Sequence, residues 1–275
     1  MRKSRLTMVA GVLAVGALAL AGCQSGGGDD GITIGIKFDQ PGLGFQDGSE
    51  YTGFDVDVAT YVADKLGYSA DQIEWVEAIS ANRETMLENG QVDMIFATYS
   101  ITDTRQEVVD FAGPYFIAGQ DLLIRSEDAG TITGPETLNG LDLCSVSGST
   151  SAQRVKDEFA EEVNLVEQPG YSQCAQFLLD GSVDAATTDD IILAGLAASQ
   201  GDGNLQVVGN PFSTENYGVG IAEGSDLCED INAAISEMIE DGSWEAAVTS
   251  NTEGTGYTAS DANPPTVMAD CSGTP

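Results

Sequence analysis

Residues 92–105 read VDMIFATYSITDTR, an apolar run followed by hydroxyl side chains and a cation. The apolar part, residues 92–97, predicts a buried strand, and Thr98, Ser100 and Arg105 follow it directly. In open α/β sheets, ligands bind outside the carboxyl ends of the strands. Arginine suits a carboxylate there, because its planar guanidinium can donate two parallel hydrogen bonds. The stretch therefore predicts an α/β sheet with an anion-accepting site at one strand end.

Strands and helices alternate along the chain on both sides of this stretch. Before it, apolar spacing predicts strands over residues 32–36 and 73–76 and helices over residues 53–67 and 82–89. The same alternation begins again after residue 140. Such alternation is typical of βαβ units and mainly parallel sheets, so two similar α/β units are expected. The second unit is predicted as strand 141–146, helix 151–162, strand 165–167, helix 172–180 and strand 183–187.

Two segments, residues 115–123 and 210–220, can link these units. If both cross, the first lobe is discontinuous and consists of residues 31–117 plus 214–275. The second lobe is then residues 118–213. A cleft between two lobes is the natural place for a small ligand.

The N-terminus has the pattern of an export signal. The first five residues carry three basic side chains, residues 8–20 are apolar, and small residues precede Cys23. The placement of Cys23 resembles the lipobox of bacterial lipoproteins, which implies removal of residues 1–22 and lipidation of the thiol. Residues 23–30 are polar and glycine-rich, as a flexible tether would be. The alternative is an ordinary signal peptide with a chance cysteine.

The chain is strongly acidic, with 44 acidic residues, 10 basic residues and no histidine. Removal of residues 1–22 takes away three basic residues and no acidic one, so the net charge falls from −34 to −37. Nucleic acid and anionic membrane surfaces are thereby excluded as direct partners of the domain. Most of this acidity serves solubility, which makes each remaining cation informative.

Four cysteines remain besides Cys23: Cys144, Cys174, Cys228 and Cys271. An even number in an exported chain predicts disulfides. Three pairings are possible, and we favour Cys144–Cys174 and Cys228–Cys271 because each stays within one lobe or one end of the chain. A metal site is not expected, because the chain has no C-x-x-C pair and no histidine.

Four short motifs together carry a family resemblance. Residues 100–105, followed by residues 109–111 and 114–116 and preceded by residues 53–57, resemble the family 3 amino-acid-binding proteins of ABC importers. The resemblance extends over roughly residues 31–250. It implies a two-lobed, periplasmic-binding-protein-like α/β fold of type II. That fold has two parallel-type sheets with flanking helices and a two-stranded hinge.

The resemblance also implies a binding role for several side chains. Arg105 would clamp the α-carboxylate of an amino acid, and Thr98 and Ser100 would add backbone and hydroxyl contacts. In the second lobe, Thr150 and Ser151 lie where a helix begins, and the amides of such a turn favour an anion. Simple capping of that helix by a hydroxyl is the alternative.

One acidic residue is expected to accept from the ligand's ammonium. The resemblance implies this role for Asp189, which follows the predicted strand 183–187. The adjacent Asp190 could be confused with it, and one of the two could instead cap the helix at Ile191. The assignment to Asp189 is the one we favour.

Ligand choice is expected to depend on Lys37 and Arg83. Lys37 follows the first strand, and Arg83 opens a helix, where a cation opposes the dipole. A side-chain carboxylate of the ligand would explain both, whereas surface ion pairing is the alternative. Residues 32–42 resemble actinobacterial glutamate-binding lipoproteins, which implies L-glutamate within the class of acidic amino acids.

The implied function is that of an extracytoplasmic substrate-binding component of an ABC importer. It would be a monomer with no cofactor, anchored through lipidated Cys23 to the outer face of the cell membrane. Its partners would be permease subunits, and its ligand would close the lobes. One alternative is an amino-acid-binding sensor lipoprotein. Another is a dehydratase of the same fold, disfavoured because no general-acid histidine, activated nucleophile or metal motif is present.

Overall fold

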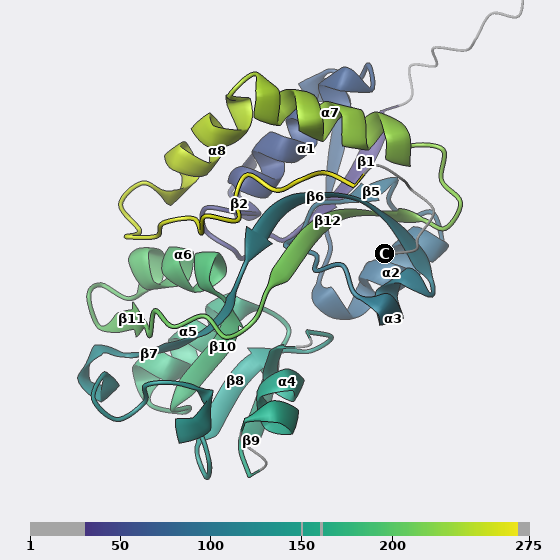
Figure 1. Ribbon diagram of the computed structural model, residues 1–275. Helices are drawn as coiled ribbons and strands as arrows, with labels where there is room; N and C mark the ends of the chain where they lie inside the picture. Colours follow the sequence, from purple (N-terminus) through teal and green to yellow (C-terminus); the bar gives the residue numbers. More distant parts are fainter. Residues whose placement is uncertain (1–30, 150, 160–161, 269–275) are drawn as a thin grey trace, which may run out of the picture. The chain divides into compact units, whose positions relative to one another are not determined.

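The computed structural model describes residues 31–149, 151–159 and 162–268 (Figure 1). From Gly31 onward the chain forms one compact unit, built on two five-stranded sheets. Several predicted features lie outside the described residues: the signal (1–22), the tether (23–30), Cys23, Thr150 and Cys271.

The first sheet has the strand order β4-β1-β5-β12-β6. Its parallel part is β1, which pairs with β4 and β5, and β12 then pairs antiparallel with β5 and β6. The strands are β1 (Ile32–Ile36), β4 (Ile73–Glu77), β5 (Met94–Ile95), β6 (Val109–Ala118) and β12 (Glu215–Ala222). The associated helices are α1 (Phe54–Lys65), α2 (Arg83–Glu88), α3 (Asp103–Gln106), α7 (Cys228–Glu240) and α8 (Ser243–Thr252).

The second sheet has the order β11-β7-β10-β8-β9. Here β8 pairs parallel with β9 and β10, while β7 pairs antiparallel with β10 and β11. The strands are β7 (Gln120–Arg125), β8 (Asp142–Val146), β9 (Asn164–Gln168), β10 (Ala185–Asp189) and β11 (Leu205–Val207). The helices are α4 (Ser151–Glu158), α5 (Tyr171–Asp180) and α6 (Asp190–Gln200). A separate hairpin joins β2 (Phe45–Asp47) to β3 (Glu50–Thr52).

Both sheets are therefore mixed, with a parallel core and antiparallel strands where the chain changes sheets. It leaves the first sheet after β6, passes through Gly119 and enters the second sheet as β7. It returns between β11 and β12, and β12 pairs with β6 from Val109↔Ala222 to Ala118↔Glu215 (Figure 1). The chain therefore leaves the first sheet at Ala118 and re-enters it at Glu215, and these two residues are paired with each other.

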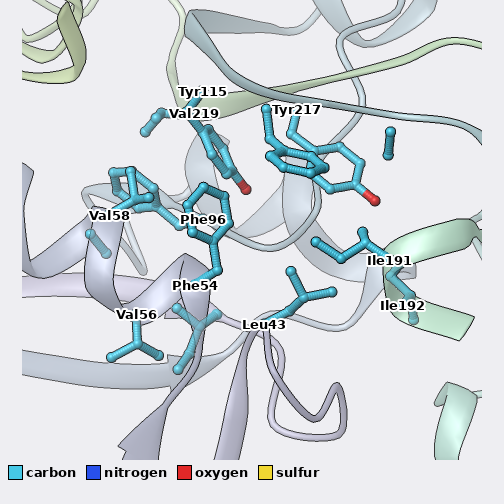
Figure 2. Packing of buried hydrophobic residues seen from close by; sticks show 14 of the residues in the cluster. Leu43, Phe54, Val56, Val58, Phe96, Tyr115, Ile191, Ile192, Tyr217 and Val219 are labelled. Atoms are coloured by element: carbon cyan, nitrogen blue, oxygen red, sulfur yellow. The ribbon is translucent and has the colours of Figure 1, made fainter. Parts of the chain in front are cut away.

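Buried aromatic side chains fill the space beneath the crossing strands. Figure 2 shows Tyr115 and Tyr217, from β6 and β12, near Phe54 of α1 and Phe96. The ring centroids of Tyr115 and Tyr217 lie 6.1 Å apart, and those of Phe54 and Tyr115 lie 6.0 Å apart. Ile191 of α6 belongs to the same cluster, so one core connects elements of both sheets. Each such buried side chain stabilises the fold by about 1.5–3 kcal/mol.

One predicted disulfide is present between described residues. Cys144 of β8 is bonded to Cys174 of α5, as expected. Cys228 is also disulfide-bonded, but its expected partner Cys271 lies outside the described residues, so that pairing stays a prediction. None of the helices within the described ranges combines the length and apolarity needed to cross a membrane.

Candidate ligand-binding site

A small polar cavity lies between side chains that follow strands of both sheets. Among the described residues that line it, Ile192 is the only aliphatic one. Five lining residues come from the part of the chain that builds the first sheet: Ser80, Arg83, Thr98, Ser100 and Arg105. The rest come from the part that builds the second sheet: Ser149, Ser151, Tyr171, Thr188, Asp189 and Ile192.

Thr98 enters the cavity from the end of β5 in a strained backbone conformation. Its φ of 47° lies in the left-handed region, which a β-branched residue rarely adopts. Its N–H donates to Asp55 Oδ2 at 3.1 Å, and its hydroxyl donates to the carbonyl of Ala97 at 2.7 Å. Asp55 also accepts the hydroxyl of Tyr115 at 2.8 Å. Asp55, in the motif at residues 53–57, thus fixes the backbone at the end of β5 through a hydrogen bond.

Asp55 is itself a buried acid. Burial raises its pKa to about 6, although the hydrogen bonds from Tyr115 and Thr98 and the charge of Arg83 act in the opposite direction. The carboxyl group therefore serves as an internal acceptor rather than as a ligand contact.

Two arginines that line the cavity, Arg83 and Arg105, both contact the buried ring of Tyr99. Each guanidinium carbon, of Arg83 and of Arg105, lies 4.8 Å from the centroid of that ring. Stacking on an aromatic face stabilises a desolvated cation. Burial, and then the charge of Arg105, lower the pKa of Arg83. Such a pair of cations favours an anionic ligand.

Each arginine keeps donor capacity that the protein does not use fully. Arg105 Nη1 donates to the carbonyl of Ser100 at 2.7 Å, and its Nε lies 3.4 Å from Glu84 Oε1. Arg83 Nη2 donates to Ser80 Oγ at 2.8 Å, while its Nε has no hydrogen-bond partner among the described residues. Glu84 also accepts the hydroxyl of Tyr99 at 2.8 Å, so one carboxylate orients both the ring and Arg105.

Hydroxyl groups form the opposite wall of the cavity. Ser149 Oγ accepts from the N–H of Ser151 and from the hydroxyl of Tyr171, both at 3.1 Å. Ser151 is the first residue of α4. Because the first amides of a helix have no intrahelical acceptor, they add donors on this side.

Asp189 is the only acidic residue in the lining as far as the structure describes the chain. Its Oδ2 accepts the hydroxyl of Tyr217 at 2.6 Å. Burial, and after it the charge of Glu215, raise the pKa of Asp189 to about 8. Glu215 itself pairs with Arg154 of α4. A carboxylate in this setting would be stabilised by a cationic group in the cavity.

Asp190, the alternative to Asp189, is occupied elsewhere. Its Oδ1 accepts from the N–H of Ile191 at 2.8 Å and from that of Gly119 at 3.3 Å. It therefore holds the start of α6 against the crossing at Gly119 and does not line the cavity.

Lys37 is almost fully buried but is not among the residues that line the cavity. Its Nζ lies 3.7 Å from Asp39 Oδ1 and has no hydrogen-bond partner among the described residues. Burial lowers its pKa to about 8, against the opposing charge of Asp39. Of the eight predicted site residues, the cavity brings together Arg83, Thr98, Ser100, Arg105, Ser151 and Asp189.

Five lining residues were not predicted: Ser80, Ser149, Tyr171, Thr188 and Ile192. Two of them, Ser149 and Thr188, are direct sequence neighbours of predicted residues, and that proximity was an available signal; Ser80 lies three residues before Arg83. Tyr171 and Ile192 carry no such signal, because only the packing of α5 and α6 brings them to the cavity. Within the described ranges, no group of three or more His, Cys, Asp or Glu side chains could hold a metal ion.

Comparison with known proteins assigns this architecture. The family model described as bacterial extracellular solute-binding proteins, family 3, matches residues 32–251. The glutamate-binding protein GluB of Corynebacterium glutamicum is 43% identical over 271 residues, which cover 90% of each chain. The ABC transporter glutamine-binding protein GlnH of Bacillus subtilis is 36% identical over 221 residues, 79% of each chain.

The solved structures agree with the type II fold. An ancestral arginine-binding protein bound to arginine superimposes with a TM-score of 0.73 at 30% sequence identity. The match covers 81% of this chain and 98% of that protein.

Proposed function

The chain belongs to family 3 of the bacterial extracellular solute-binding proteins, and from that premise we propose that it captures an acidic amino acid, L-glutamate, for an ABC importer. The similarity to GluB supports the ligand, and the similarity to GlnH supports the transporter class.

The charge pattern of the cavity is the observation that carries this proposal. Two cations, Arg83 and Arg105, share the cavity with one carboxylate, Asp189. Glutamate has two carboxylates and one ammonium, so each charge meets an opposite one. Glutamine would leave one buried guanidinium without a counter-charge, which is costly in a desolvated site.

We assign the roles from this complementarity. Arg105 donates to the α-carboxylate, with Thr98, Ser100, Thr150 and Ser151 adding amide and hydroxyl donors. Asp189 accepts from the α-ammonium. Arg83, which lines the cavity, and Lys37, which is buried, are directed to the side-chain carboxylate.

Binding proceeds by closure of two lobes, residues 31–117 plus 214–275 and residues 118–213. The crossings at Gly119 and between β11 and β12 form the hinge. Closure without a ligand would bury Asp189 and Arg83, neither of which forms an ion pair within the described part of the chain. A ligand of matching charge removes that cost and shifts the population toward the closed form.

The proposed setting is the outer face of the cell membrane. Residues 1–22 direct export, Cys23 carries the lipid, and residues 23–30 hold the domain clear of the surface. The protein acts as a monomer, and permease subunits recognise the closed form.

Calorimetry on the mature chain, residues 23–275, tests the proposal with L-glutamate, L-aspartate and L-glutamine titrated separately. We expect one-to-one glutamate binding, weaker aspartate binding because the shorter side chain reaches Arg83 less well, and still weaker glutamine binding. Arg105→Ala should abolish binding of all three, because each carries the same α-carboxylate. Lys37→Ala should weaken glutamate selectively.

Lys65→Ala is the matched control, because Lys65 pairs with Glu237 at the helix surface away from the cavity. It should leave every affinity unchanged. Glutamine binding as tight as glutamate binding would contradict the ligand class. Unchanged glutamate affinity in Lys37→Ala would contradict only the role of Lys37.

A further inference from the structure

Residues 39–41 follow β1 of the first sheet and contact the helices of the second sheet. Asp39 Oδ2 accepts the backbone N–H of Ser172 at 3.3 Å. The carbonyl oxygen of Asp39 accepts the hydroxyl of Ser172 at 2.9 Å. Neither residue lines the ligand cavity. One short segment is therefore bonded across the boundary between the two halves, away from the cavity.

The Asp39 carboxylate occupies the N-terminal end of α5, a helix of 10 residues. The residue at the cap position is Gly170, which has no side chain to offer an acceptor. Asp39 supplies that acceptor from the other half of the molecule, where a negative charge is also favoured by the helix dipole. Lys37 Nζ lies 3.7 Å from Asp39 Oδ1 without a hydrogen bond among the described residues, so we do not count it as part of this contact.

Two glycines allow this close approach. A Cβ at Gly170 would lie 2.3 Å from Asp39 Oδ2, and a Cβ at Gly195 would lie 2.2 Å from the carbonyl oxygen of Pro41. Gly170 has φ −145°, and Gly195 lies inside α6, so any residue could adopt either backbone conformation. Glycine inside a helix costs roughly 0.5–1 kcal/mol relative to alanine. Glycine at these two positions therefore allows residues 39–41 to approach α5 and α6 closely.

We propose that residues 39–41, Gly170, Ser172 and Gly195 form a closure seam, which sets the affinity for every ligand without choosing among them. This inference depends on the proposed closure of the two lobes. Seam contacts exist only when the halves are together, so they stabilise the closed form whatever the cavity holds. Because apparent affinity scales with the population of the binding-competent form, a weaker seam weakens all ligands by one common factor.

Two variants of the mature chain test the seam by calorimetry with L-glutamate, L-aspartate and L-glutamine. Gly195→Ala should obstruct Pro41 while favouring the α6 helix, and Asp39→Asn should remove the charge at α5. Each should lower every measurable affinity by about tenfold, while the ratios between ligands stay within about twofold. The melting temperature of ligand-free Gly195→Ala should not fall.

Gly130→Ala is the matched control, because no heavy atom lies within 4 Å of the added Cβ. It should leave all affinities unchanged. Affinities that stay at the wild-type level in Gly195→Ala, or ligand ratios that shift by more than about tenfold, would overturn the seam. A shift in the ligand ratios would show that these residues help to select the ligand.

Hydrogen exchange measured by mass spectrometry makes the test independent of the ligand assignment. The peptide containing Ser172 should exchange faster in both variants than in the wild type, because its amide loses Asp39 in the closed form. The difference should be larger with amino acid than without it, in proportion to the population of the closed form. Unchanged exchange would overturn the seam even if glutamate binds as proposed. Faster exchange in a protein that binds none of the three amino acids would retain the seam and reject the ligand class.

Discussion

At the scale of the residue, Asp189 is a buried carboxylate in the cavity, and the proposed closure would depend on a ligand that meets its charge. It is 5% exposed and forms no ion pair with a described cation, although the charge of Arg154 acts to lower its pKa. Its hydrogen bond from Tyr217 lowers the pKa, but burial prevails and raises it to about 8. An ammonium placed beside it would reverse that balance, because an opposite charge stabilises the ionised form.

Replacing this carboxylate should separate stability from binding. A folded pKa near 8, above the unfolded value near 4, means that ionised Asp189 destabilises the fold. This cost is absent below pH of about 4 and grows as the pH rises toward 8. Asp189→Asn should therefore raise the melting temperature of the ligand-free protein at pH 7, by about 2–4 °C for each kcal/mol removed, and weaken amino-acid binding.

Scanning calorimetry at several pH values between about 4 and 8 measures this difference. The excess of the melting temperature of Asp189→Asn over that of the wild type should shrink as the pH falls. Asp64→Asn, at an exposed position on α1, is the control and should show no comparable trend. An equal or lower melting temperature for Asp189→Asn at pH 7 would refute the electrostatic account.

At the scale of the element, helix α5 joins three features of the second half. Its first residue, Tyr171, lines the cavity, and its second, Ser172, meets Asp39. Its fourth residue, Cys174, is bonded to Cys144 of β8 over a sequence separation of 30. The disulfide therefore fixes the helix that carries both a cavity wall and the seam.

Removal of this disulfide should destabilise the fold more than the binding site. Closing a loop of this length restricts the unfolded chain, and its loss costs about 3–4 kcal/mol. The double variant Cys144→Ala with Cys174→Ala should lose that much free energy of unfolding in a urea titration. Because α5 stays packed through its buried face, glutamate affinity well below the unfolding temperature should change much less. A loss under about 1 kcal/mol would show that the bridge is dispensable.

At the scale of the whole molecule, two crossings and one shared aromatic core connect the halves. The strand pair of β6 and β12 carries both crossings, and Asn263, from the segment after α8, bonds both the N–H and the carbonyl of Ile117. These contacts lie at the proposed hinge, whereas the cavity and the seam lie between the surfaces that the proposed closure would bring together. Such an arrangement permits rotation of one half about the crossings without disruption of either sheet.

Small-angle scattering should detect this rotation directly. Saturating L-glutamate should reduce the radius of gyration of the mature chain, because the closed form is more compact. Arg105→Ala should remain at the ligand-free value under the same conditions, since it lacks the α-carboxylate clamp. A radius of gyration that is identical with and without glutamate, in a sample shown by calorimetry to bind it, would exclude closure as the response.

Local sequence patterns predicted helices and strands well where apolar residues recur with the period of the element. The helix expected over residues 53–67 is α1, and the strand expected over residues 32–36 is β1 with the same bounds. The strand expected over residues 92–97 is only Met94–Ile95 in regular pairing. The apolar run continues, but Thr98 adopts a left-handed conformation there because Asp55, far away in sequence, accepts its N–H.

By itself, the sequence determined the α/β class, the family and the strand-end arginine, because these depend on periodicity, on short motifs and on residue chemistry. It favoured Cys144–Cys174 among three possible pairings, and the structure confirmed that pair. Only the tertiary structure decided which residues meet. It brought Tyr171 and Ile192 to the cavity, separated Asp189 from Asp190, and put Lys37 beside Asp39 outside the cavity lining. The physical reason is that helix packing and chain crossings set distances between segments far apart in sequence, and no local pattern encodes those distances.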